Sequence, residues 1–220
     1  MEYGLCNPLK FTLITNPYDV TFETDIINRL FREGLDELHL RKPDYTKDDY
    51  MEFIERIDPE HHSKLVLHSY YTLVHNYDIR KIHLNYNWRK NPAMRFFLNQ
   101  AVLLGKKIRK STTVNNYKSL YAAKPGIDEL IMGPVFSKIS NSINNQLVKT
   151  ETLEKALSHS KVPVIGLGGV GADTLGFFKS VGFDGIALQS SVWRSMDPIK
   201  AFIEVRDYDM QVETRLRKAA

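Results

Sequence analysis

The sequence predicts a closed parallel (β/α)8 TIM barrel of the α/β class, and two observations carry this prediction. Short apolar runs rich in Val, Ile and Leu recur about every 20 to 25 residues, with amphipathic stretches between them, as in repeated β-α units. Eight such runs are present, and eight parallel strands close into a barrel. The length of 220 residues suits one such domain over residues 1–220, because these barrels reach ~200–250 residues as a single unit.

Each apolar run is an expected strand. In chain order the strands are 11–15 (FTLIT), 37–41 (ELHLR), 64–69 (KLVLHS), 81–85 (KIHLN), 106–111 (KKIRKS), 129–135 (ELIMGPV), 162–167 (VPVIGL) and 185–191 (GIALQSS). The fourth and fifth have the weakest strand pattern. Without them the sequence would fit an open doubly wound sheet of six or fewer strands, which is the alternative fold.

The stretches between the strands carry ordinary helix signals. Thr46 is placed to cap a helix whose first turn holds Asp48 and Asp49, and Met51, Ile54 and Ile57 form its apolar stripe. Further helices are expected over 113–126, over 150–163 and from Pro198 onward. The connection 136–150 is polar and long, as in an active-site flap or a disordered loop, and we call it the flap.

Composition restricts the class of partner. Apolar residues make up 43% and charged residues 25%, and the net charge of +4 comes from scattered Lys and Arg. No basic stripe interleaved with aromatics is present, so an anionic small molecule is expected rather than nucleic acid. Cys6 is the only cysteine, no apolar run approaches the ~18–20 residues of a membrane span, and the start lacks a signal-peptide pattern. A cytoplasmic protein without membrane association is expected, and a homo-oligomer is left open.

Functional residues of a parallel barrel lie at the carboxyl ends of its strands. The candidates at those ends are Thr15, Asn16, His39, Arg41, His68, Ser69, His83, Asn85, Ser111, Gly133, Pro134, Gly166, Gly168, Gly169, Gln189, Ser190 and Ser191.

The ends of the seventh and eighth strands predict a phosphate site. Gly168 and Gly169 let the backbone approach a ligand closely, and Ser190 and Ser191 precede a further helical turn. Gln189 stands at the same strand end, and barrels often bind phosphate with these two loops. The alternative is a tight turn followed by a serine-capped helix.

Arg41 and three histidines are candidates for the chemistry. Arg41 would grip a second phosphate or a carboxylate, or form a salt bridge to Asp44 at the rim. His39, His68 and His83 would line one wall of the barrel, and one of them would act as acid or base. Hydrogen-bonded histidines are favoured over a zinc site because no acidic ligand accompanies them at a strand end. A Ser-His-Asp hydrolase has no support, since there is no Gly-x-Ser-x-Gly elbow.

Several segments resemble, in order and spacing, the signature of the thiamine phosphate synthase family, which also contains a thiazole tautomerase branch. They are ELHLRKPD, KLVLHS, KIHLN, Ser111, LIMGPVFS, VPVIGLGGV and GFDGIALQSSVW. The resemblance implies a (β/α)8 barrel that joins a pyrimidine diphosphate to a thiazole phosphate, with loss of pyrophosphate and with magnesium. It implies that Gly168, Gly169 and Ser190 hold the thiazole phosphate, that Arg41 grips the diphosphate and that Ser111 is an active-site serine.

The sequence also departs from the family pattern. Pro43 stands where the family has a lysine, so Lys42 would have to swing in, and His68 and Ser69 replace an Asn-Asp pair whose aspartate binds magnesium. Asn87 replaces a second metal-linked aspartate. The flap differs from the family's Pro-Thr-x-Thr-Lys at positions that include Ser137, Lys138, Ser140 and Asn141. Since magnesium needs anionic oxygen ligands, these changes weaken the expectation of a bound ion.

Three functions therefore stay open. The first, and the one favoured, is a synthase with a rearranged diphosphate site in which Lys42, Lys138 and His68 replace the usual groups. The second is a tautomerase-type isomerase acting on a thiazole carboxylate phosphate; the histidine of that branch is Pro134 here, so His39, His68 or His83 would serve instead. The third is a non-catalytic phosphate-ligand binder.

Overall fold

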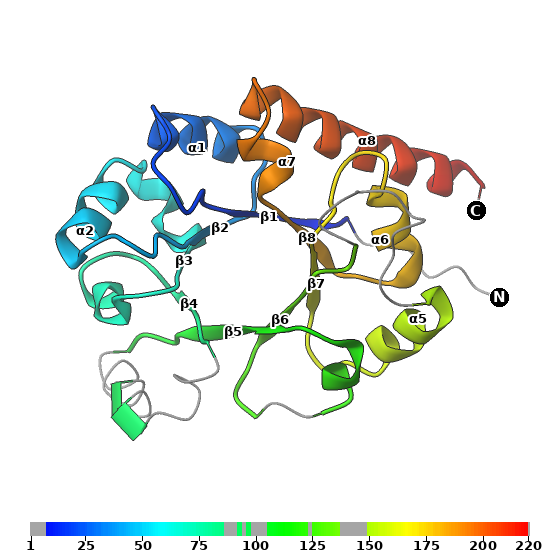
Figure 1. Ribbon diagram of the computed structural model, residues 1–220, viewed down its shortest axis with the longest axis horizontal. Helices are drawn as coiled ribbons and strands as arrows, with labels where there is room; N and C mark the ends of the chain where they lie inside the picture. Colours follow the sequence, from blue (N-terminus) through cyan, green and yellow to red (C-terminus); the bar gives the residue numbers. More distant parts are fainter. Residues whose placement is uncertain are drawn as a thin grey trace.

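A computed structural model describes residues 8–85, 92–93, 96–97, 105–122, 125–136 and 149–219 of the chain, with side chains as far as residue 211. Eight parallel strands form a ring with helices outside it (Figure 1). The strands are β1 (Lys10–Ile14), β2 (Glu37–Leu40), β3 (Leu65–Leu67), β4 (Lys81–His83), β5 (Arg109–Val114), β6 (Glu129–Met132), β7 (Val164–Leu167) and β8 (Gly185–Leu188).

The predicted closed barrel is confirmed, and the alternative open sheet is wrong. Each strand pairs with the next in sequence, and β8 returns to pair with β1 over Lys10↔Gly185 to Leu13↔Leu188. The two strands with the weakest pattern, β4 and β5, are both part of the ring and pair with each other.

Helices cover the outside of the barrel. They are α1 (Glu23–Arg32), α2 (Lys47–Glu55), α5 (Thr150–Ser158), α6 (Leu175–Val181), α7 (Ser190–Trp193) and α8 (Pro198–Ala219), with 3-10 turns η1 (Pro59–Lys64), η2 (Tyr71–His75) and η3 (Tyr117–Leu120). α1, α7 and α8 pack side by side along one flank (Figure 1). None of the helices in the described ranges is both long and apolar enough to cross a lipid bilayer.

The expected cap of α2 is confirmed. The hydroxyl oxygen of Thr46 accepts a hydrogen bond from the Asp49 backbone N–H, and the Asp49 carboxylate accepts one from the Thr46 N–H, which together form a capping box. Ile54 and Ile57 are buried as predicted, while Met51 is half-buried.

The predicted boundaries around the fifth strand are wrong. β5 runs to Val114, three residues beyond the expected end at Ser111, and the expected helix over 113–126 is replaced by the short turn η3. The β-branched residues Thr112, Thr113 and Val114 favour extended backbone. The Thr112 hydroxyl also donates to the Leu84 carbonyl at 2.6 Å, which holds this extension against the neighbouring chain.

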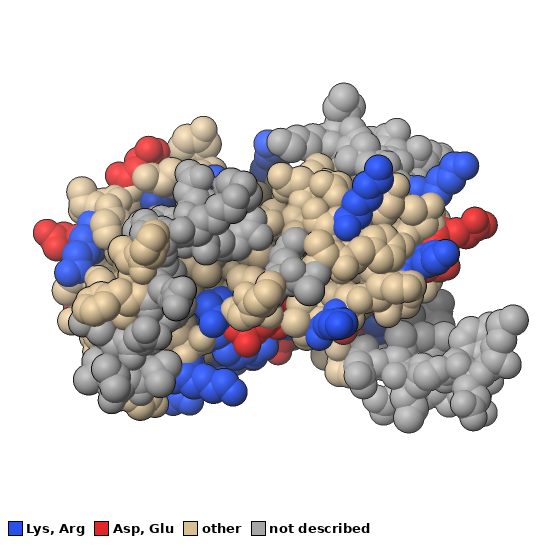
Figure 2. Space-filling model, turned by 90° about the horizontal axis from the view of Figure 1, so that it is seen from below, with Lys and Arg blue, Asp and Glu red and all other residues tan. Residues whose placement is uncertain are grey.

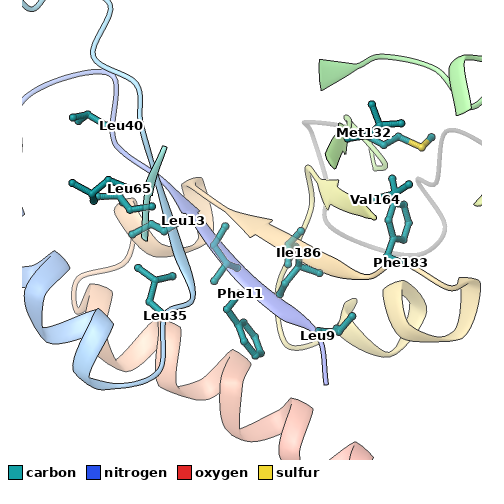
Figure 3. Close-up of a cluster of buried hydrophobic side chains, with 14 of the residues drawn as sticks. Leu9, Phe11, Leu13, Leu35, Leu40, Leu65, Met132, Val164, Phe183 and Ile186 are labelled. Atoms are coloured by element: carbon teal, nitrogen blue, oxygen red, sulfur yellow. The ribbon is translucent and has the colours of Figure 1, made fainter. Parts of the chain in front are cut away.

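The apolar core has two parts. The larger lies between the strands and the outer helices and includes Phe11, Leu35 and Ile186 (Figure 3). Phe11 packs edge-on against Phe202 of α8 with ring centroids 5.9 Å apart. The smaller lies inside the barrel and consists of Ile14, Ile131, Ile165 and Ala187 from β1, β6, β7 and β8. The inner side chains of β2, β4 and β5 are polar instead, so the barrel interior is apolar on one side and polar on the other.

Charged side chains do not gather by sign on the face drawn in Figure 2. Lys and Arg lie there among Asp, Glu and uncharged residues. This distribution matches the scattered charge expected from the sequence.

Candidate functional site

Two adjoining cavities open at the carboxyl ends of the strands. The central cavity, of about 810 Å³, includes Arg41, His68, His83 and Asn85 in its lining. The side cavity, of about 480 Å³, lies over the ends of β6, β7 and β8. Thr113, Asn115, Leu167 and Gln189 line both cavities, so they form one continuous site.

The three predicted histidines lie together on one wall. The rings of His68 and His83 stack with centroids 4.3 Å apart and an interplanar angle of 14°. His39 meets both edge-on, and its Nδ1 lies 2.9 Å from Nε2 of His68. The parallel registers of β2 with β3 and of β3 with β4 bring the three histidines side by side, although His39 and His68 are 29 positions apart in sequence.

The contacts of these rings are those of hydrogen-bonded histidines. His83 reaches the Ser111 hydroxyl with Nδ1 at 2.9 Å and the Thr113 hydroxyl with Nε2 at 3.0 Å. His39 directs Nε2 at the Glu37 carboxylate at 3.0 Å. The ring nitrogens lie close enough to share an ion. However, both nitrogens of His39 and of His83 already face protein partners, and two of the rings are stacked, so the lone pairs do not converge on a tetrahedral centre.

A layer of charged groups lies beneath the histidines, and all of them except the partly exposed Lys10 are buried. Glu37 of β2 and Glu129 of β6 alternate with Lys10 of β1 and Lys81 of β4, and the four ion pairs between them span 2.5–2.9 Å. These strands are not all neighbours, so the side chains must meet inside the barrel. Two carboxylates and two ammonium groups balance to zero charge, which is the condition for keeping such groups away from water.

Burial sets the protonation of the inner groups. It lowers the pKa of His68 and of His83 well below the ordinary value, and the nearby histidines and Arg41 lower both further. Burial alone would raise the pKa of Glu37, but its contacts with His39, Lys10 and Lys81 hold that pKa well below the ordinary value. At neutral pH the site therefore combines neutral His68 and His83 with an ionised Glu37.

Arg41 lies at the mouth as predicted. Its side chain is exposed and lines the central cavity, and its backbone is held by Thr15, whose hydroxyl accepts from the Arg41 N–H and donates to the Arg41 carbonyl, both at 2.9 Å. Within the described part of the chain Arg41 forms no ion pair, so the alternative salt bridge to Asp44 is not made. Its guanidinium is available to an anion.

The expectation that Lys42 swings into the site is wrong. Its side chain is buried behind α1 and α2, where Nζ lies 2.5 Å from the Glu23 carboxylate and donates to the Tyr18 carbonyl at 2.8 Å. Arg41 and Lys42 are adjacent in sequence at the end of an extended segment, so their side chains leave on opposite sides.

The predicted serines lie further from the ligand space. Ser111 is fully buried in the middle of β5 and contacts the site only through His83, because the strand continues past it. Ser69 is half-buried beside the Tyr50 hydroxyl and is absent from the described lining of both cavities. Asn87 and the flap positions Ser137, Lys138, Ser140 and Asn141 lie outside the described residues.

The predicted phosphate loops line the side cavity together. Gly168 and Gly169 have φ of 96° and 72°, and they border the cavity with Gln189 and Ser190. Both glycines are also required by packing, because a Cβ on Gly169 would lie 2.6 Å from Cβ of Phe136. The glycines therefore form the tight turn that was the alternative to a phosphate site, and this turn also borders an open cavity.

Sequence reasoning missed several lining residues, among them Arg194, Thr113 and Asn115. Arg194 is exposed at the rim of the side cavity, one helical turn after Ser190, and its charge and spacing could have identified it. Thr113 and Asn115 were assigned to a helix, although the β-branched run 112–114 was a signal for a longer strand.

The donor set of the cavities suits anions better than magnesium. Within the described ranges, the lining of both cavities holds two arginines, two histidines, amides and hydroxyls but no carboxylate. Magnesium requires hard anionic oxygens in octahedral array, which these side chains do not supply. The described residues therefore do not fit a protein-held magnesium ion.

These features define a (β/α)8-barrel protein whose mouth carries cationic and neutral polar groups over two joined cavities. The chain belongs to the thiamine monophosphate synthase family, whose model matches residues 11–192. The family resemblance expected from the sequence is thereby confirmed, and it relates the chain to thiamine biosynthesis.

Individual relatives agree with this membership. The thiamine-phosphate synthase of Lactococcus lactis subsp. lactis is 30% identical over 94 residues, which cover 42% of this chain and 44% of that protein. That of Levilactobacillus brevis is 36% identical over 72 residues, 33% of each chain. The matched segments thus span less than half of these curated relatives.

Solved structures extend the likeness of fold to nearly the whole chain. A thiamine phosphate pyrophosphorylase from Bacteroides thetaiotaomicron superposes with a TM-score of 0.74 at 24% identity, covering 91% of this chain and 97% of that one. One from Pyrococcus furiosus gives a TM-score of 0.73 at 21% identity, covering 95% and 99%.

Proposed function

We propose that this protein catalyses a synthase-type transfer, in which a pyrimidine diphosphate and a thiazole phosphate are joined and pyrophosphate is released. The bond from a carbon of the pyrimidine reactant to its diphosphate breaks, a bond from that carbon to the thiazole forms, and the diphosphate leaves as pyrophosphate. The observation that carries the proposal is the pair of exposed arginines, Arg41 in the central cavity and Arg194 in the side cavity. Two phosphorylated reactants need two anion subsites within one continuous space.

The side cavity would hold the thiazole phosphate. Its glycine backbone at 168–169 permits close approach of phosphate oxygens, and the Ser190 hydroxyl and the Arg194 guanidinium supply donors. Thr113 and Gln189, shared by both cavities, would then contact the ring that points toward the second reactant.

The central cavity would hold the pyrimidine diphosphate. Arg41 would grip the diphosphate and stabilise the charge that develops as it leaves, which is the main task of a transferase site of this kind. The flap lysine Lys138 stays a proposed second contact. Lys42 is not part of this proposal, since it is paired with Glu23. Magnesium would reach the site only on the diphosphate's own oxygens, because the described lining offers no carboxylate.

The test is an assay of pyrophosphate release with both reactants, in the presence of magnesium and in the presence of a chelator. The proposal expects release that requires both reactants and is lost in Arg41→Ala. A protein that binds both reactants and releases no pyrophosphate under either condition would contradict it and would leave the non-catalytic binder.

A second candidate is a tautomerase-type isomerisation of a thiazole carboxylate phosphate. The specific observation in its favour is His68, which lines the central cavity and is held neutral by burial, as a proton acceptor should be. Such a reaction needs one phosphate subsite and no leaving diphosphate. If the protein isomerises the thiazole carboxylate phosphate but releases no pyrophosphate from the two reactants, the isomerase is favoured over the synthase-type transfer.

A further inference from the structure

The buried chain Glu37–His39–His68 runs from the charged layer to the central cavity. Glu37 lies 3.0 Å from Nε2 of His39, and Nδ1 of His39 lies 2.9 Å from Nε2 of His68. His39 is completely buried, while His68 lines the cavity. Nδ1 of His68 has no hydrogen-bond partner among the described residues. It is therefore the nitrogen left for a ligand.

We propose that Glu37 and His39 are positioning residues that hold His68 with its proton on Nε2 and present Nδ1 to the ligand as a proton acceptor. The direction of the Glu37–His39 hydrogen bond sets the direction of the His39–His68 hydrogen bond. A carboxylate can only accept, so the proton between Glu37 and His39 is on Nε2 of His39. With one ring proton, placed on Nε2, His39 accepts at Nδ1, so the proton between the two histidines belongs to His68.

The charged layer fixes the donor-to-acceptor direction of these two hydrogen bonds. Lys10 and Lys81 both contact Glu37, so it stays an acceptor, and Lys81 also contacts Glu129. These four charges already balance, so an additional proton on buried His39 would carry uncompensated charge into the interior. The other groups facing His68 are His83, stacked on it, and Arg41 at the mouth, and neither competes for the proton on Nε2.

The same chain explains how His68 could take a proton and return it. A ligand X–H bond breaks and an Nδ1–H bond forms on His68. The resulting imidazolium keeps its Nε2–H bond to His39, whose Nε2–H points at the Glu37 carboxylate, so the new charge is opposed by a fixed negative one. In an isomerisation the proton returns to another ligand atom and no further reactant is needed. The ligand's place in the cavity rests on the proposed function, but the tautomer of His68 does not, so the two can fail separately.

The test is nitrogen NMR on ligand-free protein with 15N-labelled histidine at pH 7, which distinguishes protonated from unprotonated ring nitrogens. The wild type is expected to show His68 protonated on Nε2 and bare on Nδ1. In His39→Leu the Nε2–H would face an apolar side chain, and an unpaired buried N–H is costly, so the majority form should become Nδ1–H, facing cavity water.

Conservative and control variants separate positioning from packing. His39→Gln should keep the wild-type tautomer, because its amide oxygen can accept from His68 while its amide nitrogen donates to Glu37. Thr113→Val, which removes a partner of His83 only, should leave the His68 signals unchanged. If His39→Leu fails to fold, Glu37→Gln serves instead. A glutamine amide can donate to His39 as well as accept from it, so the fraction of His68 protonated on Nε2 should fall. A wild-type His68 protonated on Nδ1, or a tautomer that no variant moves, would overturn the proposal.

Discussion

The ammonium group of Lys42 lies 2.5 Å from the Glu23 carboxylate, and this buried pair turns the lysine away from the barrel mouth that its neighbour Arg41 enters. Burial raises the pKa of Glu23, and the bonds from Lys42 oppose that rise. The pair joins the segment after β2 to the start of α1. Its role is therefore structural.

Replacing Lys42 should reduce stability and spare binding. Lys42→Met leaves Glu23 buried without its partner, and breaking such a pair costs ~3–5 kcal/mol in the free energy of unfolding. Urea denaturation measures the loss, and exposed Lys47→Met is the matched control. If Lys42→Met is as stable as the wild type but no longer binds pyrimidine diphosphate, Lys42 is a ligand-binding residue and the structural role is contradicted.

Replacing Gly169 should disturb the phosphate turn. In Gly169→Ala the new Cβ would lie 2.6 Å from Cβ of Phe136 at a φ of 72°, and strain plus overpacking should cost ~1–3 kcal/mol. Gly176→Ala in α6 is the control, because nothing lies within 4 Å of its Cβ, and stability there should stay equal or rise by up to ~1 kcal/mol. Equal thermal midpoints for both variants would argue against the tight packing of this turn.

The stacked histidines should make stability depend on pH. His68 and His83 have a pKa well below the ordinary 6.5, so the folded state binds fewer protons than the unfolded state just below that pH. Their contribution is full above about pH 6.5 and falls as the pH drops, by up to ~1.4 kcal/mol per pH unit and group. Glu37, which lies next to them and whose pKa is held well below its ordinary value, stays ionised over this range.

Urea denaturation between pH 7.5 and 5.5 measures this slope. His83→Gln should flatten it, whereas exposed His75→Gln should not. Stability that is constant over this range in the wild type would contradict the buried neutral histidines.

A negative charge at position 190 should expel phosphate. Ser190 borders the side cavity, so Ser190→Asp places a carboxylate against the thiazole phosphate and should weaken its binding at least ~10-fold. Exposed Ser158→Asp carries the same charge elsewhere and should bind as the wild type does. Calorimetry measures the affinity for thiazole phosphate. An unchanged affinity in Ser190→Asp would contradict the placement of the phosphate in the side cavity.

The barrel could be predicted from sequence because its strands are short, apolar and evenly spaced, and even the polar β4 and β5 keep that spacing. The end of β5 was missed. Thr112, Thr113 and Val114 favour extended backbone, but their pairing with Leu130, Ile131 and Met132 of β6, which fixes where the strand ends, is not visible in the local sequence.

Part of the site was also predictable. Strand alternation brings His39 and His83 inward, and loop position identifies the glycines at 168–169. The balanced layer of Lys10, Glu37, Lys81 and Glu129 was not predicted, because it depends on which strands face one another across the barrel. Whether Arg41 or Lys42 enters the mouth depends likewise on one buried carboxylate on α1.

The central claim is that one continuous site holds two separate anion subsites, and crossed titration tests it most directly. Calorimetry would compare thiazole phosphate and pyrimidine diphosphate on the wild type, on Arg41→Ala and on Arg194→Ala, each with and without magnesium. Charged hydrogen bonds are worth ~1.5–3 kcal/mol, so we expect Arg41→Ala to weaken the diphosphate ~10–100-fold and spare thiazole phosphate, and Arg194→Ala to do the reverse. Thiazole phosphate should bind equally without magnesium. Equal loss of both ligands in either variant, or no binding to the wild type, would contradict the two-subsite account.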